Sequence, residues 1–197
     1  MRTSPSRPIA IGLAIAAAAC AQGPSWRIRV TLNTPGPNPM SWGPALAYDA
    51  ARNVCVLFGG TTGGTITWTW DGRAWTQYLV TPAPSARVSP GMVYDSERAV
   101  TVLYGGDFGT TYADTWEWNG ASWTQRNIPG PGPRARHGMA YDSDRHVTVL
   151  YGGGVNDTWE YDGIAWVQRS SNDAPLGGSM AYDSARHITL QVDGQNT

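Results

Sequence analysis

Residues 138–153, which read GMAYDSDRHVTVLYGG, decide the fold of this chain. Two apolar runs, 138–141 and 147–151, are separated by the polar segment 142–146, and two glycines follow them. Short runs that are rich in β-branched and aromatic residues and bounded by turn residues are typical of β-strands. The stretch therefore predicts two neighbouring strands joined by a tight turn.

The same pattern recurs along the chain. A Tyr-Asp-x-x-Arg signature begins at four tyrosines separated by 46, 47 and 41 residues: Tyr48, Tyr94, Tyr141 and Tyr182. An aromatic residue and two glycines follow the first three signatures, at 58–60, 104–106 and 151–153. Each of these units then has two aromatic residues two positions apart and ends on a further tryptophan: Trp75, Trp123 or Trp166. A period of about 40–50 residues with such landmarks is typical of propeller blades.

Each unit also has the turn chemistry of a four-stranded meander. Between the third and fourth predicted strands lie Asp71-Gly72, Asn119-Gly120 and Asp162-Gly163, dipeptides that supply the positive φ of tight hairpins. A meander cannot bury its aromatic face alone, and radial stacking of several meanders covers it. The content of 24 Gly, 14 Pro and 10 Trp agrees, because Gly and Pro interrupt helices. We therefore predict an all-β propeller.

The third unit resembles a bacterial kelch repeat. The resemblance rests on Pro133-Arg134-x-Arg136-His137-Gly138, Tyr151-Gly152-Gly153, the run 156–161 and Trp166. It extends over about residues 38–193 and implies a kelch-type β-propeller, with repeats near 40–80, 87–128, 134–170 and 177–197. The motifs describe the fold and do not specify a function.

About four blades are visible, and the last is incomplete. Residues 25–29 look like a lone fourth strand, three full repeats follow, and the unit 177–197 has only two predicted strands. Propellers need about 4–8 blades. Three interpretations stay open: a shortened product of a longer propeller, an open arc that assembles with copies of itself, and a degenerate four-bladed ring. The first is favoured.

Residues 1–21 have the pattern of an export signal. Arg2 and Arg7 precede the apolar run 9–19, and small residues follow it. Eleven residues would span only about 16 Å as a helix, short of the ~30 Å bilayer core. Either a secretory signal is cleaved after Ala19 or Ala21, or Cys20 carries the lipid anchor of a lipoprotein. We expect an exported product of residues 22–197, in the periplasm, on the cell surface or secreted, without a membrane span.

The predicted binding residues lie on the variable connections that share one face of a meander, because variable loops on a rigid scaffold commonly carry function. The candidates are Arg87, Asp107, Phe108, Tyr112, Arg134, Arg136 and His137. The alternative interpretation is that these are loop residues without a ligand. For His137, a structural hydrogen bond is favoured over catalysis or metal binding.

No motif predicts catalytic residues, a metal site or a cofactor. The three histidines are dispersed, and the strand residue Cys55 has no zinc-ligand spacing around it. The aspartate of each Tyr-Asp-x-x-Arg signature lies at a turn, where such side chains bond nearby backbone N–H groups. With 14 basic and 15 acidic residues the chain is nearly neutral and lacks a basic stripe, so nucleic acid is not a predicted partner.

Three functions are compatible with these patterns. The leading hypothesis is an exported, non-catalytic interaction module that recognises a protein or a glycan through the variable loops. The second is a structural or self-assembling repeat fragment without its own ligand. The third is a carbohydrate-active enzyme, which would need convergent carboxylates in a polar pocket at the centre of the ring.

Overall fold

The computed structural model describes residues 36–37, 41–62, 64–171 and 178–192 of the chain. These residues form fourteen β-strands in antiparallel sheets. Within the described residues there is no α-helix, and accordingly none that could cross a membrane. The all-β prediction is confirmed.

Three sheets have four strands each, in the simple order of a meander. Blade 1 consists of β1 (Pro44–Asp49), β2 (Val54–Gly59), β3 (Thr67–Trp70) and β4 (Trp75–Tyr78). Blade 2 consists of β5 (Gly91–Asp95), β6 (Val100–Tyr104), β7 (Thr115–Trp118) and β8 (Trp123–Arg126). Blade 3 consists of β9 (Gly138–Asp142), β10 (Val147–Tyr151), β11 (Thr158–Tyr161) and β12 (Trp166–Ser170).

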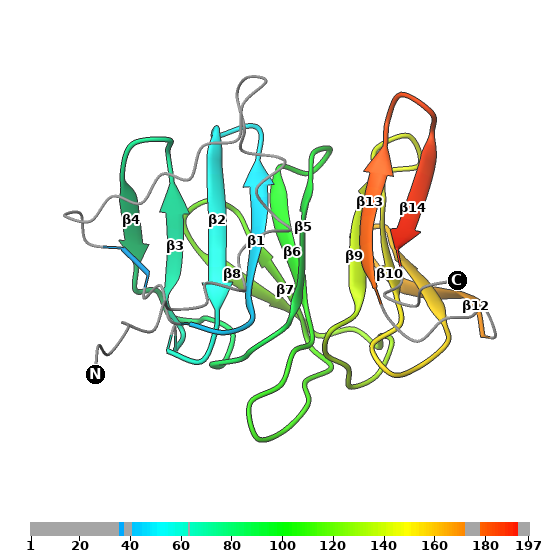
Figure 1. Cartoon of the computed structure of the whole chain (residues 1–197), viewed down its shortest axis with the longest axis horizontal. Helices are drawn as coiled ribbons and strands as arrows, with labels where there is room; N and C mark the ends of the chain where they lie inside the picture. The colour runs from blue at the N-terminus through cyan, green and yellow to red at the C-terminus, as the bar shows by residue number, and fades with distance from the viewer. Residues whose placement is uncertain (1–35, 38–40, 63, 172–177, 193–197) are drawn as a thin grey trace, which may run out of the picture.

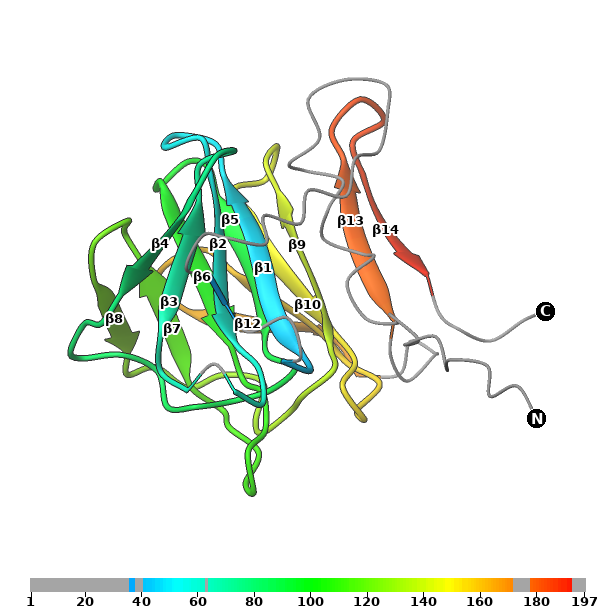
Figure 2. The same ribbon diagram turned by 60° about the vertical axis from the view of Figure 1, so that its left-hand side comes forward.

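A fourth sheet, here called the partial blade, has two described strands, β13 (Ser179–Asp183) and β14 (Ile188–Val192). The four sheets follow one another around a common centre, which the first strands β1, β5, β9 and β13 line (Figure 1). A view turned by 60° places β13 beside β9, on the side away from β4 (Figure 2). The arrangement is that of an incomplete propeller. Residues 25–29, the predicted extra strand, lie outside the described residues.

The turn residues act as the sequence predicts. In the β3–β4 hairpin the Asp71 carboxylate accepts bonds from the N–H groups of Arg73 and Ala74, both at 2.8 Å. Gly72 between them has a φ of 93°, a conformation that glycine adopts without steric cost. The Asp-x-x-Arg turns are closed in the same way: the Asp49 carboxylate accepts a bond from the N–H of Arg52 at 3.1 Å.

Neighbouring blades interlock through tryptophan. The Trp123 indole of blade 2 donates to the Thr67 hydroxyl of blade 1 at 2.7 Å, and its ring meets Phe58 edge to face at 5.4 Å. Trp166 of blade 3 repeats the arrangement on blade 2, where it donates to Thr115 at 2.9 Å. Buried indoles usually find such a partner, since an unpaired N–H is costly. The closing tryptophans of blades 2 and 3, Trp123 and Trp166, are therefore core residues, whereas Trp75 of blade 1 is only partly buried.

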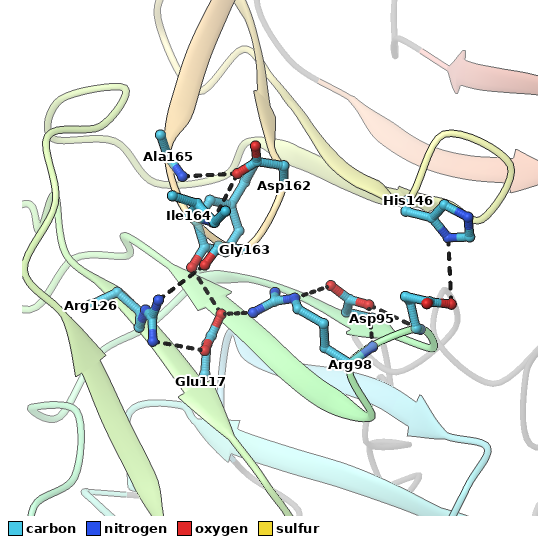
Figure 3. Close-up of polar contacts among 11 residues, drawn as sticks. Asp95, Arg98, Glu117, Arg126, His146, Asp162, Gly163, Ile164 and Ala165 are labelled. Carbon is cyan, nitrogen blue, oxygen red and sulfur yellow. Dashed lines mark hydrogen bonds and ion pairs between the residues drawn. The ribbon is translucent and has the colours of Figure 1, made fainter.

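A polar cluster adds to the junction of blades 2 and 3. Figure 3 shows Glu117 on β7 between Arg98 and Arg126, with the Asp162-Gly163 turn of blade 3 above them. Arg98 bonds both Glu117 and Asp95. The buried carboxylates of Asp95 and Glu117 are thus paired with partly exposed arginines, as burial of a charge requires.

We predict that Trp123→Ala lowers the free energy of unfolding by about 3–5 kcal/mol, the usual cost of removing a large buried aromatic side chain. Trp123 is 2% exposed. Urea denaturation followed by far-UV circular dichroism measures the change. Leu79→Ala, at a side chain that is 75% exposed, is the control and should shift stability by no more than about 0.5 kcal/mol. Equal costs for the two variants would contradict the interlock of blades 1 and 2.

Candidate binding face

The connections between second and third strands, together with the linkers between blades, emerge on one side of the molecule, here called the loop face. This follows from antiparallel order, because every second connection returns to the same end of a sheet. The connection between β6 and β7 projects furthest, at the lower edge of Figure 1. It is here called the 105–114 loop and lies between the linkers 79–90 and 127–137.

The 105–114 loop is tied to its surroundings through the backbone. Asp107 forms a bridge with Val88 of the preceding linker, with N–O distances of 2.8 and 2.9 Å. The N–H of Tyr112 donates to the Gly106 carbonyl at 2.8 Å and closes the base of the loop. Phe108 lies near its tip and is 52% exposed. The loop therefore presents an aromatic side chain from a held backbone.

Arg87 anchors this loop from inside. Its guanidinium donates to the two carboxylate oxygens of Asp114 at 2.6 and 2.9 Å and to the Gly105 carbonyl at 2.8 Å. It also lies 4.2 Å above the ring of Tyr112, a favourable cation–π distance. The side chain is fully buried. Arg87 thus fixes the loop and offers no donor to a ligand at the surface.

Blade 3 repeats the anchor. Arg134 is 2% exposed and bonds both carboxylate oxygens of Asp157, at 2.6 and 3.1 Å, and the Gly152 carbonyl at 3.1 Å. Although burial opposes ionisation, hydrogen bonds from Arg87 and Arg134 lower the pKa of Asp114 and of Asp157, respectively. Two of the predicted binding residues, Arg87 and Arg134, are thus buried beneath the loop face.

Arg136 has the opposite environment. Its side chain is 75% exposed and lies 3.8 Å from the carboxylate of Asp107. Its backbone φ is 59°, a left-handed conformation that is uncommon for a residue other than glycine. The N–H of Arg136 donates to the Ser89 carbonyl at 3.1 Å. Gly43 and Ser89, at the corresponding positions of the other two linkers, have φ values of 66° and 50°, so this conformation is a feature of the repeat.

Trp42 joins this region and was missed by the sequence reasoning. It is 70% exposed and lies on the linker that leads into blade 1, the counterpart of the linker segment around Ser89 and Arg136. The N–H of Ser89 donates to the carbonyl of Gly43, next to Trp42, at 2.6 Å. A signal was present: Trp42 is a tryptophan outside the repeat positions that form the core.

A shallow groove of about 460 Å³ runs beside the 105–114 loop. One wall is the segment 110–114 and the other is the end of β8 with the residues after it, 125–129. Tyr112 belongs to the 110–114 wall. It is half-buried, and its ring packs against the guanidinium of Arg87. The groove is open to solvent, and its lining combines hydroxyl, amide, charged and apolar groups.

His137 lies beneath the loop face. It is 8% exposed, packs edge to face on Tyr104 at 5.8 Å, and neither ring nitrogen has a hydrogen-bond partner among the described residues. A Cβ at Gly91 would be 2.5 Å from its Nε2 atom. Burial, reinforced by the charge of Arg134, lowers the pKa of His137 to about 3. His137 is therefore a neutral packing residue, and the hydrogen bond expected of it is absent from this part of the structure.

Side chains that could hold a metal do not gather in the described part of the chain: no group of three or more His, Cys, Asp or Glu side chains occurs there. The turn aspartates bond their own repeat, as in the 2.6 Å pair of Asp142 and Arg145. Cys55 is buried on β2 and disulfide-bonded. The other cysteine of the chain, Cys20, lies outside the described residues, as does the predicted export signal 1–21.

Comparisons with known proteins add little to this description. No protein-family model matches the chain, and no curated protein does. Among solved structures, one titled "Structure of YjhT" matches with 12% sequence identity over 77% of this chain and 71% of that chain, at a TM-score of 0.42. The fold assignment therefore rests on the strands and sheets of the chain itself.

We predict that Arg87→Ala lowers the free energy of unfolding by about 3–5 kcal/mol, the cost of leaving a buried ion-pair partner without its counter-charge. Arg136→Ala removes the same side chain from the surface and should change stability by no more than about 0.5 kcal/mol. Urea denaturation of both variants at neutral pH makes the comparison. Similar losses for the two would show that Arg87 does not anchor the 105–114 loop.

The second prediction for this face concerns acid. An unfolded histidine titrates near pH 6.5, whereas folded His137 titrates near 3. Between these values the unfolded state binds a proton that the folded state does not, so stability falls as the pH falls through this window. We expect His137→Leu to remove a large part of the loss between pH 6.5 and 4.5, above the range in which the aspartates titrate. Urea midpoints at several pH values measure it, and an unchanged pH dependence would contradict it.

Proposed function

We propose that this protein is an interaction module that binds a protein or a glycan through Trp42, Phe108, Asp107 and Arg136 on the loop face. The observation that carries the proposal is the joint exposure of two aromatic rings, Trp42 at 70% and Phe108 at 52%, beside a charged pair on a held backbone. Trp and Arg dominate the energetics of protein interfaces. Exposed Trp also offers a flat apolar surface with a polar N–H, suited to the face of a sugar ring.

The anchoring arginines support this proposal indirectly. Arg87 and Arg134 fix the 105–114 loop and the 127–137 linker from inside, so Asp107, Phe108 and Arg136 are carried by segments that need little ordering on binding. Pre-organised loops lose less conformational entropy when a ligand binds. The groove between 110–114 and 125–129 extends the same face and would receive an adjoining part of a long ligand.

Two finer statements belong to this proposal. The repeats are of the kelch type, for which the motifs around Arg134 and Tyr151 are the support. The product acts outside the cytoplasm, for which the pattern of residues 1–21 is the support. The proposed function is recognition without catalysis. It is supported by the aspartates beneath the loop face, because Asp114 and Asp157 are each bound to an arginine in a bidentate pair.

The test is a binding screen of the purified chain against a glycan array and an array of extended peptides. We expect saturable binding to one class and a loss of at least about tenfold in affinity for Trp42→Ala and for Arg136→Ala, since central Trp and Arg contacts cost about 2 kcal/mol or more when truncated. Arg73→Ala is the matched control, because Arg73 is exposed on the opposite side, in the β3–β4 turn. Binding that survives both loop-face substitutions would refute the proposed site.

A further inference from the structure

The hairpin turn between β7 and β8 of blade 2 contains the only Asn-Gly pair of the chain, Asn119-Gly120. Asn119 and the two residues after the glycine, Ala121 and Ser122, are exposed. Glycine has no Cβ, so other groups can approach its backbone closely. The turn therefore places a side-chain amide next to an unhindered backbone nitrogen, in contact with water.

Two backbone N–H groups polarise the amide of Asn119. Its carbonyl oxygen Oδ1 accepts hydrogen bonds from the N–H groups of Ala121 and of Ser122, both at 2.9 Å. When a nucleophile attacks the carbon of a carbonyl group, negative charge develops on this oxygen. Backbone donors aimed at such an oxygen form an oxyanion hole, and the loss of one donor slows an enzyme by about a hundredfold or more. The turn thus favours attack on Cγ of Asn119.

The neighbouring nitrogen is available for this attack. Within the described residues the N–H of Gly120 donates no hydrogen bond. The side chain of Arg52 from blade 1 packs on this glycine, because a Cβ added to Gly120 would lie 2.2 Å from its Nε atom. A cation beside an ionisable group favours the anionic form of that group. Arg52 therefore assists deprotonation of the Gly120 nitrogen.

The hairpins of blades 1 and 3 carry an aspartate where blade 2 has Asn119. Asp162 accepts a hydrogen bond from the N–H of Ala165 at 2.9 Å, as Asp71 does from Ala74 at 2.8 Å (Figure 3). These hydrogen bonds lower the pKa of both carboxyls. Both aspartates are therefore ionised at neutral pH, and a carboxylate resists nucleophilic attack. The same turn accommodates an aspartate at two of its three occurrences, so it would accommodate one at position 119.

We propose that Asn119 is a site of spontaneous deamidation in the folded protein. The nitrogen of Gly120 bonds to Cγ of Asn119, the bond from Cγ to Nδ2 breaks, and Nδ2 leaves as ammonia with the proton from Gly120. Water then opens the cyclic imide. Cleavage at the side-chain carbonyl gives aspartate, and cleavage at the backbone carbonyl gives isoaspartate. Water is the only co-reactant, and no group is oxidised or reduced.

The two products have different consequences for the fold. Aspartate keeps both hydrogen bonds of the turn and adds a negative charge near Arg52. Isoaspartate adds a carbon atom to the main chain within the turn, directly before the strand that begins at the buried Trp123. We expect Asn119→Asp to keep or raise the thermal midpoint, and the purified isoaspartate form to have a lower one. The hairpin turns lie on the side opposite to the loop face, so this inference is independent of the binding function proposed there.

The test follows the whole chain at mildly alkaline pH, once in buffer and once in urea. Trypsin releases residues 99–126, and mass spectrometry of this peptide measures the conversion of Asn119. We expect the native rate to be no more than about tenfold below the rate in urea. A reaction confined to unfolded molecules would be slower by about a thousandfold or more, because they are so rare under native conditions. A native amide that stays intact while the amide in urea converts would overturn the proposal.

Two controls separate the turn from general ageing of the protein. Asn127 is also exposed but is followed by the β-branched Ile128, and it should stay intact while Asn119 converts. Asp71→Asn is the matched variant, because it creates a second Asn-Gly pair in a turn with the same two backbone donors. We expect position 71 of this variant to convert in the native state as well. An intact amide at that position, or conversion of Asn127 as fast as that of Asn119, would overturn the role assigned to the turn.

Discussion

The contact between a fourth-strand tryptophan and the third strand of the preceding blade is the constraint on which the rest of this structure depends. Trp123 and Trp166 each place an indole N–H on a buried threonine hydroxyl of the neighbouring blade. A four-stranded meander has an aromatic face that it cannot bury alone, so each blade is stable only against its neighbours. This interlock therefore fixes how each blade is placed against the blade before it.

The same dependence explains why the blades differ in their exposed surfaces. Where a neighbour is present, as between blades 2 and 3, Glu117 is shared between an arginine of its own blade and Tyr161 of the next. In blade 3 the buried carboxylate of Glu160 is paired with two arginines of its own blade, Arg145 and Arg169. The buried carboxylate on the third strand is thus neutralised in both blades.

Arginine occurs in two environments on the loop face of this protein, buried in an ion pair or exposed to solvent, and the sequence patterns did not distinguish them. Arg134 and Arg136 are two residues apart on one linker, yet Arg134 is buried in a bidentate pair with Asp157 and Arg136 is exposed. The buried arginines anchor the loop face, and the exposed one belongs, with Trp42 and Phe108, to the proposed binding site. If that proposal holds, different copies of the same residue type carry stability and recognition on this face.

The sequence by itself determined the all-β class, the succession of four-stranded units, the hairpin turns and the core role of Trp123 and Trp166, because these depend on short-range periodicity and turn chemistry. Only the tertiary structure decided which polar residues face solvent. Arg87 is buried because the meander brings Asp114 and the carbonyl of Gly105 to its guanidinium, whereas Arg136 stays exposed. No local sequence pattern encodes these long-range contacts.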